Sequence, residues 1–264
     1  MTPMRHALTI AGSDSSSGAG VQADLKTFAA HRVFGTSVIT TLTAQNTAGL
    51  RGLSAVDPAF VGAQLDAVLA DLPVAAVKTG MLATPETVAL VASYAARLPG
   101  LVVDPVLVAS SGDRLFTEDA EKAYLDLLFP HATVITPNLR EASVLLGRAV
   151  LDVDDAVNAA ADLARYGPQC VVIKGGHLRG SREAVDVLWH DGHIELLTAP
   201  WIDTANNHGT GCTFAAATAA RLALGAPLPE ALRGAKDYVH EALTRSAGWS
   251  LGAGHGPLSW GPFD

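Results

Sequence analysis

The sequence is poor in cysteine and in positive charge, and each shortage argues against a class of protein. Its 264 residues include only two cysteines, Cys170 and Cys212, and neither belongs to a C-x-x-C pair. We therefore expect no disulfide framework and no cysteine zinc site, and a reducing cytoplasm is the expected location. Lys and Arg number 18 against 26 Asp and Glu, a formal net charge of −8. A binder of nucleic acid or of a membrane surface needs a basic face, so neither partner is expected.

The sequence also lacks a long uninterrupted apolar run. The longest, residues 214–226, is broken by Arg221 and is too short to span a bilayer. The run at 7–11 is too short for the apolar core of a secretory signal. Hydrophobic residues nevertheless make up 49% of the chain, which favours a folded domain over disorder.

Segments with strand character alternate with segments of helical spacing along most of the chain. This alternation predicts an α/β fold with a mainly parallel central sheet and helices on both faces. Asp191-Gly192 predicts a turn between strands at 184–190 and 193–198, an antiparallel hairpin at the sheet edge. No internal repeat or linker stands out, so residues 1–264 are expected to form one domain with an irregular tail from about 248. The expected strands are 7–11, 37–42, 74–78, 101–104, 133–136 and 170–174, and the expected helices are 21–31, 58–70, 85–98, 118–129, 139–146, 154–166, 212–224 and 229–246.

Ligands of open α/β sheets bind beyond the carboxyl ends of the strands, and several polar residues follow predicted strands. The loop 12–20 is rich in glycine but lacks G-x-G-x-x-G and a Walker lysine. Asp24 follows it, either as a site residue or as an ordinary acidic helix start. Gln45 has the donor and acceptor that suit a nitrogen heterocycle, or it bonds to backbone. Met81 is either a soft wall for a flat ring or core filler.

Three charged residues at later strand ends suit a nucleotide and its metal. Asp104 can hold Mg²⁺ directly or through water, or it begins a turn before proline. Glu141 has the spacing of a capping box with Asn138, or it orders the water shell of a metal. Lys174 ends a strand before two glycines, where we expect it to reach a nucleotide phosphate.

The strongest single element is Gly209-Thr210-Gly211-Cys212, where a glycine-bearing loop enters an Ala-rich helical pattern. Backbone N–H groups at such a junction bind an anion and can stabilise a phosphoryl group in transfer. A helix N-terminus lowers the pKa of a thiol, so Cys212 is expected to accept a proton from an attacking hydroxyl. Together these residues predict a phosphotransferase that uses ATP and Mg²⁺.

Seven motifs together resemble the hydroxymethylpyrimidine/phosphomethylpyrimidine kinases of thiamine biosynthesis, a family with the ribokinase-like fold. The resemblance runs from about Ala7 to Ala247. The motifs are Ala11-Gly12-Ser13-Asp14, residues 18–27 (GAGVQADLKT), Thr43-Ala44-Gln45-Asn46-Thr47, Lys78-Thr79-Gly80-Met81-Leu82, Thr136-Pro137-Asn138 with Glu141, Lys174-Gly175-Gly176-His177 and His208-Gly209-Thr210-Gly211-Cys212-Thr213.

The resemblance implies ATP-dependent phosphorylation of 4-amino-5-hydroxymethyl-2-methylpyrimidine, then of its monophosphate to the pyrophosphate, by a homodimer. It implies that Cys212 occupies the base position, where many ribokinase-like enzymes carry aspartate. The other implied roles are Gly12, Asp24, Gln45 and Met81 around the pyrimidine, Gly209 and Gly211 in the anion hole, Lys174 on ATP phosphate, and Asp104 and Glu141 at Mg²⁺.

Two positions depart from the family pattern. Ser110 stands where a lysine is common, which makes a weaker second phosphorylation a possibility, and Ser17 stands where glycine is frequent. Residues 12–20 and 110–115 are both candidates for the loop that closes over the substrate. A pyridoxine/pyridoxal kinase of the same fold is the nearest alternative, and a non-catalytic pyrimidine sensor is the alternative from another class.

Overall fold

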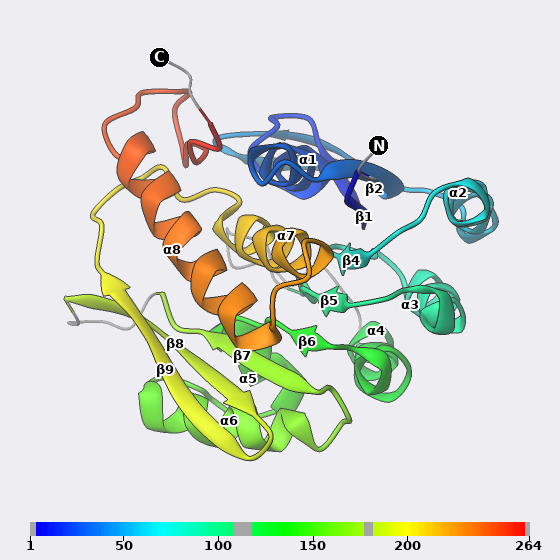
Figure 1. Ribbon diagram of the computed structural model, residues 1–264. Coiled ribbons are helices and arrows are strands. Elements are labelled where there is room, and N and C mark those ends of the chain that lie inside the picture. Colours follow the sequence, from blue (N-terminus) through cyan, green and yellow to red (C-terminus); the bar gives the residue numbers. More distant parts are fainter. Residues whose placement is uncertain (1–3, 108–117, 177–181, 262–264) are drawn as a thin grey trace.

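The computed structural model describes residues 4–107, 118–176 and 182–261. Its centre is a nine-stranded sheet in the order β3-β2-β1-β4-β5-β6-β7-β8-β9 (Figure 1). The strands from β2 through β7 pair in parallel, while β3, β8 and β9 pair antiparallel with their neighbours. The strands are β1 His6–Asp14, β2 Phe34–Asn46, β3 Gly49–Ala55, β4 Ala76–Thr79, β5 Leu101–Val103, β6 Val134–Ile135, β7 Cys170–Lys174, β8 Glu183–His190 and β9 His193–Pro200.

Helices cover both faces of this sheet, which confirms the predicted fold class. One face carries α1, α7 and α8, and the other carries α2, α3, α5 and α6 (Figure 1). The α-helices are α1 Gly20–Ala30, α2 Pro58–Asp71, α3 Pro85–Ser93, α4 Glu118–Ala123, α5 Leu139–Leu146, α6 Val153–Ala164, α7 Thr210–Ala223 and α8 Leu228–Ser246, and the irregular turns are η1 Ala95–Arg97, η2 Tyr124–Leu128 and η3 Phe129–His131.

Side-chain alternation along the central strands explains why helices cover both faces of the sheet. In β7, Val171 and Ile173 belong to one apolar cluster and Cys170 and Val172 to the other, and all four side chains are fully buried. Successive strand residues point to opposite faces, so a strand that is apolar throughout needs cover on both. The helix α7 provides much of one cover through a run of buried alanines, which lets its backbone approach the sheet closely.

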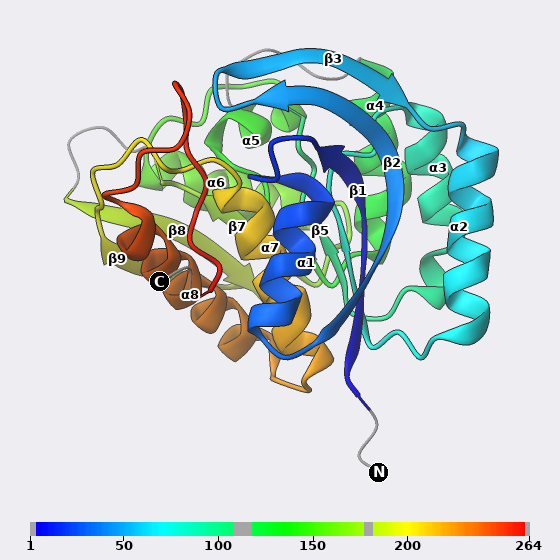
Figure 2. The ribbon, with the colours of Figure 1, turned by 90° about the horizontal axis from the view of Figure 1, so that it is seen from above.

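The structure adds an edge strand that the sequence pattern did not predict. The strand β2 continues to Asn46, and a turn at Thr47-Ala48 leads into β3, so the two strands form a long curved pair (Figure 2). Gln45 therefore lies on a strand rather than in a loop. Residues 43–55 are mostly polar, small or exposed, so they show no apolar strand pattern. Backbone hydrogen bonds to β2 are what make β3 a strand.

The second hairpin is confirmed. Asp191 and Gly192 join β8 to β9 with φ values of 50° and 79°, the left-handed conformation that two-residue hairpin turns need. The predicted helix at 118–129 is α4 followed by a π-helical turn, η2, and a 3₁₀ turn, η3, that contains Pro130. Proline has no N–H to donate, so the α-helix does not continue through it.

Within the described ranges, no helix combines the length and the apolar character that crossing a bilayer requires. The predictions made for Ser110 and for the segment 110–115 lie outside the described residues.

Candidate active site

A cavity of about 710 Å³ opens at the carboxyl ends of the parallel strands and extends along the N-terminus of α7. It lies next to β1, where the strand order reverses and where α/β folds bind their ligands. Its lining brings together nine of the ten predicted site residues, which are Gly12, Gln45, Met81, Asp104, Glu141, Lys174, Gly209, Gly211 and Cys212.

One end of the cavity is the start of α7. Gly209 is the N-cap and has φ 85°, and a Cβ there would overlap the carbonyl oxygen of Gly18. A Cβ on Gly211 would lie 2.9 Å from Nζ of Lys174 and 3.6 Å from Oδ2 of Asp104. Glycine at these two positions lets the first backbone N–H groups of α7 face a lysine and a carboxylate at close range.

Lys174 and Asp104 form an ion pair at this end. Nζ of Lys174 donates to Oδ1 of Asp104 at 2.7 Å, and Thr136 Oγ1 donates to the same oxygen at 3.1 Å. Burial alone would lower the pKa of Lys174, but the charges of Asp104 and Glu141 outweigh it and raise that pKa. The lysine therefore stays charged beside the helix N-terminus, with Asp104 as its counter-ion.

Glu141 forms the capping box that its spacing allowed. Its Oε2 accepts from the N–H of Asn138 at 2.9 Å, and Asn138 Oδ1 accepts from the N–H of Glu141 at 2.9 Å. Burial, set against the charge of Lys174, raises the pKa of Glu141 to about 7. The carboxyl is thus poised to ionise near neutral pH when a cation arrives.

Asp14 ties the first loop to the loop before α7. Its two carboxylate oxygens accept from the backbone N–H groups of Ser16, Gly18 and Ala19 and from the Ser16 hydroxyl. Oδ2 also lies 2.8 Å from Nε2 of His208. Burial opposes ionisation, but these hydrogen bonds outweigh it and hold the pKa of Asp14 far below its usual range. The charged carboxylate therefore joins the glycine-rich loop to the residue that precedes Gly209.

The opposite end of the cavity is lined by Gly12, Gln45 and Met81. A Cβ on Gly12 would lie 2.8 Å from Cε of Met81, so glycine is needed for the methionine to lie against β1. The Nε2 atoms of Gln45 and His208 are 3.4 Å apart. A carboxylate only accepts, so Nε2 of His208 donates to Asp14 and cannot accept from Gln45. Within the described part of the chain the Gln45 amide then has no acceptor among its recorded partners, so its N–H groups can donate to a ligand.

Asp24 does not line this cavity, and the expected contact with the pyrimidine is corrected. The side chain is fully buried, and its Oδ2 accepts from Lys78 Nζ at 2.8 Å and from Thr9 Oγ1 at 2.6 Å. Asp24 belongs to α1 beside the sheet and points at β4 rather than into the open cavity. Its physical role is to balance the charge of Lys78.

The expectation of a low thiol pKa is also wrong. Burial raises the pKa of Cys212 to about 11, although the charge of Lys78 lowers it. Desolvation disfavours the thiolate more than the charge of Lys78 and the Gly20 N–H favour it, and the negative charges of Asp24 and Asp104 disfavour it further.

Sequence reasoning missed three members of the site, namely Lys78, Asp14 and His208. All three stood inside the motifs of the family resemblance, but none had a role assigned. Lysine buried at a strand end was a usable signal, since it had already singled out Lys174. The pairing of Asp14 with His208 spans 194 positions, so no local pattern indicates it.

The carboxylates fit one Mg²⁺ ion held jointly with phosphate. The described residues contain no cluster of three or more His, Cys, Asp or Glu side chains that would form an all-protein metal cage. Mg²⁺ usually keeps several waters and binds one or two carboxylates plus substrate phosphates. Asp104 and Glu141 both line the cavity and match that donor set.

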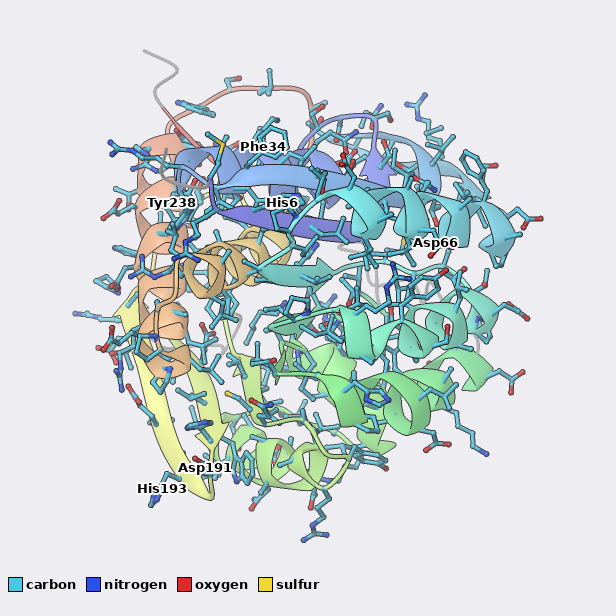
Figure 3. All side chains as sticks on the ribbon, turned by 45° about the vertical axis from the view of Figure 1, so that its right-hand side comes forward. His6, Phe34, Asp66, Asp191, His193 and Tyr238 are labelled. Carbon is cyan, nitrogen blue, oxygen red and sulfur yellow. The ribbon has the colours of Figure 1, made fainter. Side chains whose placement is uncertain are left out.

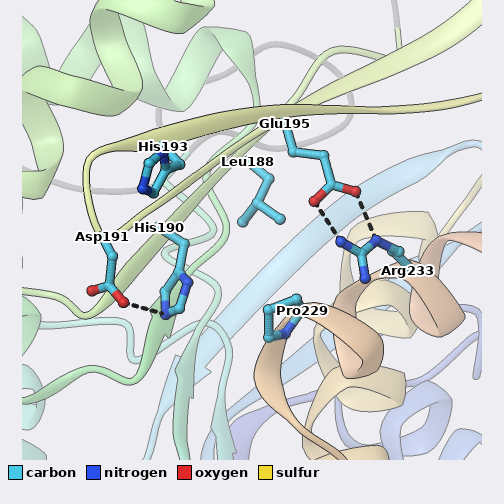
Figure 4. A pocket seen from close by; sticks show the side chains of 7 residues that line it. All are labelled: Leu188, His190, Asp191, His193, Glu195, Pro229 and Arg233. Carbon is cyan, nitrogen blue, oxygen red and sulfur yellow. Dashed lines mark hydrogen bonds and ion pairs between the residues drawn. The ribbon is translucent and has the colours of Figure 1, made fainter.

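A smaller pocket, of about 170 Å³, lies between the β8–β9 hairpin and the start of α8 (Figure 4). Its charged groups are satisfied within the chain, because Arg233 makes two 2.7 Å hydrogen bonds to Glu195. Asp191 and His193 mark the hairpin tip, on the opposite side of the molecule from Phe34 in Figure 3. We assign no function to this pocket.

The chain is similar to known kinases over almost its whole length. A model of the family described as phosphomethylpyrimidine kinase matches residues 14–259. A hydroxymethylpyrimidine/phosphomethylpyrimidine kinase of Rhizobium meliloti is 48% identical over 254 residues, which cover 96% of this chain and 95% of that protein. An equally named protein of Bacillus subtilis is 42% identical over 255 residues, covering 96% and 93%.

Solved structures of two kinds of kinase are similar to this chain. The ADP complex of a Bacillus subtilis pyridoxal kinase has a TM-score of 0.89 and 40% identity, with 97% of each chain covered. A phosphomethylpyrimidine kinase from Clostridium difficile has a TM-score of 0.79 and 39% identity, covering 90% of this chain and 98% of that one. With its ribokinase-like fold and a glycine-bearing helix start in the cavity, this chain belongs to the phosphomethylpyrimidine kinase family and is an ATP-dependent kinase.

Proposed function

We propose that this kinase phosphorylates the hydroxymethyl group of 4-amino-5-hydroxymethyl-2-methylpyrimidine and then phosphorylates the monophosphate to the pyrophosphate. The observation that carries the proposal is the geometry of one cavity. A polar amide with free N–H groups, Gln45, and a soft wall, Met81, line the same cavity as the glycine-bearing start of α7. A small heteroaromatic alcohol fits between them, with its hydroxyl directed at the anion site.

The nucleotide is proposed to occupy the rest of the cavity. Its far part is lined by Trp201 and by Val239 and Leu243 of α8, whose apolar surfaces suit a flat base. Lys174 lies between that part and the α7 N-terminus, within reach of phosphate oxygens. The N–H groups after Gly209 would then bind the γ-phosphoryl group as its charge develops.

The proposed chemistry is an in-line displacement. The substrate oxygen forms a bond to the γ-phosphorus as the bond to the leaving ADP oxygen breaks. The hydroxyl proton passes to the thiolate of Cys212, which later returns it to water. Asp104 and Glu141 would hold Mg²⁺, which supplies charge neutralisation at the phosphates when bound. Burial raises the pKa of this thiol to about 11, so the thiolate fraction grows as the pH rises toward that value.

A coupled assay of ADP release on three substrates tests the proposal. Hydroxymethylpyrimidine and its monophosphate are expected to be turned over, each with a higher kcat/KM than pyridoxal. Pyridoxal is included because several similar solved structures are pyridoxal kinases. A preference for pyridoxal would replace the proposed substrate, and ligand binding without ADP release on any of the three would indicate a sensor.

The Cys212→Ala variant tests the base role separately. We expect turnover to fall about 10²- to 10⁴-fold, the range for losing a general base. Binding of pyrimidine and nucleotide, measured by calorimetry, should change little. Near-native turnover in Cys212→Ala would remove the thiol from the mechanism without affecting the proposed substrate.

We also propose that the chain forms a homodimer. Leu42, Leu50 and Leu53 on the β2–β3 pair are each 40% or more exposed, which is costly for an isolated edge hairpin. Light scattering coupled to size exclusion should give twice the mass of one chain. A monomer at micromolar concentration would contradict this proposal.

A further inference from the structure

The C-terminal tail is buried near its end although it has no regular secondary structure. Residues 248–261 follow α8 and form neither a helix nor an extended strand. Figure 2 shows this red end of the chain running from α8 past the turn between β2 and β3. Leu258, Ser259 and Trp260 are nevertheless 0%, 2% and 4% exposed. A buried segment without regular structure needs hydrogen-bond partners elsewhere in the fold, and those partners show what the tail holds.

The middle of the tail bonds to the turn between β2 and β3. The N–H of His255 donates to the carbonyl of Thr47 at 2.9 Å, and the N–H groups of Ala253 and Gly254 donate to Thr47 Oγ1 at 3.2 and 3.3 Å. A Cβ on Gly254 would overlap the Thr47 carbonyl oxygen, so glycine is needed for this close approach. Thr47 lies two residues after Gln45, so the tail holds the strand end that carries this amide.

The same stretch bonds to the loop before α7. The N–H of Gly256 donates to the carbonyl of Ala205 at 3.2 Å, and the Gly256 carbonyl accepts from the N–H of His208 at 3.0 Å. Nδ1 of His255 lies 2.8 Å from Oδ1 of Asn207. The tail therefore lies between the β2–β3 turn and the loop that leads to the N-cap of α7, and its backbone bonds to both.

The end of the tail is anchored on the first turn of α7. Nε1 of Trp260 donates to Oγ1 of Thr213 at 2.9 Å, and both side chains are buried. Thr213 closes this turn, because its N–H donates to the carbonyl of Gly209 at 2.8 Å. Nζ of Lys26 lies 4.5 Å from the centre of the indole ring and donates to the Ser17 carbonyl at 2.8 Å. One tryptophan thus contacts the start of α7 and the lysine that bonds to the first loop.

We propose that Trp260 is a positioning residue for phosphoryl transfer, which holds the first turn of α7 through Thr213 and so aims its backbone N–H groups at the transferred group. The inference rests on the anion site at the start of α7 in the proposed function. Neither Trp260 nor Thr213 lines the cavity, so both act through the backbone of α7 and touch no ligand. Placement matters because an error of about 1 Å can cost about 10²-fold in rate.

Removal of either partner of the Trp260–Thr213 hydrogen bond tests the proposal. Thr213→Val keeps the shape and removes the acceptor, and Trp260→Phe keeps a ring beside Lys26 and removes the donor. Each variant is expected to lower kcat about ten- to a hundredfold, with little change in KM. The assay is ADP release with whichever of the three heteroaromatic alcohols is turned over. Calorimetry should still give one nucleotide site per chain with an unchanged Kd, which separates misplacement of the helix start from loss of fold.

Two threonine variants are the matched controls. Thr213→Ser restores an acceptor hydroxyl and should return kcat close to the wild-type value. Thr218→Val removes an equally buried hydroxyl farther along α7, where it bonds only to the Phe214 carbonyl of its own helix. It should lower the melting temperature as Thr213→Val does and leave kcat unchanged. The double variant Thr213→Val/Trp260→Phe should lose no more kcat than the more affected single variant, because both changes remove the same bond.

The proposal is overturned if Thr213→Val and Trp260→Phe keep the wild-type kcat, or if Thr218→Val lowers kcat as much as Thr213→Val. It is also overturned if the two losses multiply in the double variant. If Trp260→Phe does not fold, equal kcat values for Thr213→Val and Thr213→Ser are sufficient to reject it. Near-native turnover in Gly209→Ala would instead remove the anion site itself. Loss of turnover in Gly209→Ala with full kcat in Thr213→Val would remove Trp260 alone.

Discussion

Replacement of Gly209 by alanine tests the anion site through one methyl group. Gly209 has φ 85°, and the new Cβ would overlap the carbonyl oxygen of Gly18. The Gly18 carbonyl cannot move aside as a flexible side chain would, because Asp14 holds this stretch of backbone through the N–H groups of Gly18 and Ala19. The N-terminus of α7 must therefore separate from the first loop.

The expected effect of Gly209→Ala has two parts, a loss of stability and a loss of rate. An alanine in the left-handed region costs roughly 1–2 kcal/mol of stability. Displacing backbone donors from the transferred phosphoryl group costs more in rate, about 10²- to 10³-fold in kcat, the effect of losing one anion-hole donor. We expect the rate to fall far more than the stability would suggest.

Gly225→Ala is the matched control for the strain. Gly225 follows α7 with φ 89°, and nothing lies within 4 Å of a Cβ built there. Both variants should lose melting temperature, at about 2–4 °C for each kcal/mol in a chain of this size. Only Gly209→Ala should lose ADP release in the coupled assay. Turnover within about threefold of wild type in Gly209→Ala would refute the assignment of this helix start as the anion site.

Three further changes test other parts of the site. The kcat/KM of the wild type should rise with pH between 7 and 10, because the thiolate of Cys212 increases about tenfold per unit below its pKa. Cys212→Asp places a base that is already ionised there and should flatten the profile, and a wild-type profile flat from 7 to 10 would contradict proton transfer to the thiol. Gln45→Ala should weaken pyrimidine binding in calorimetry and leave ATP binding intact, so equal loss of both would count against its role. The pKa of Asp14 is depressed on folding, so its contribution to stability is present above the unfolded pKa and disappears as the pH falls through the acidic range below it. Asp14→Asn should therefore lower stability by about 3 kcal/mol at pH 7, with a smaller difference from wild type at pH 3 in urea denaturation, and a constant difference would argue against a charged Asp14.

Local sequence determined most of the fold. Apolar strands such as Cys170–Lys174 are covered on both faces, and this pattern together with helical periodicity indicates parallel βαβ units. The Asp191-Gly192 turn was equally predictable from the sequence, because the left-handed backbone of such a turn favours residues such as Asp and Gly. The strand β3 was not, since an edge strand that pairs only through its backbone leaves no apolar alternation.

For the candidate site, too, local sequence predicted one part and left another part unpredicted. Sequence determined that Gly209, Gly211 and Cys212 stand at a helix start, because capping and helix polarity are local properties. Only the tertiary structure decided what surrounds them. The pairing of Asp24 with Lys78 spans 54 positions, and it moved Asp24 from the expected ligand contact to the support of a buried lysine. The state of the thiol followed from the same packing, since burial and the charges brought together by α1, β4 and β5 act over distances that no sequence pattern encodes.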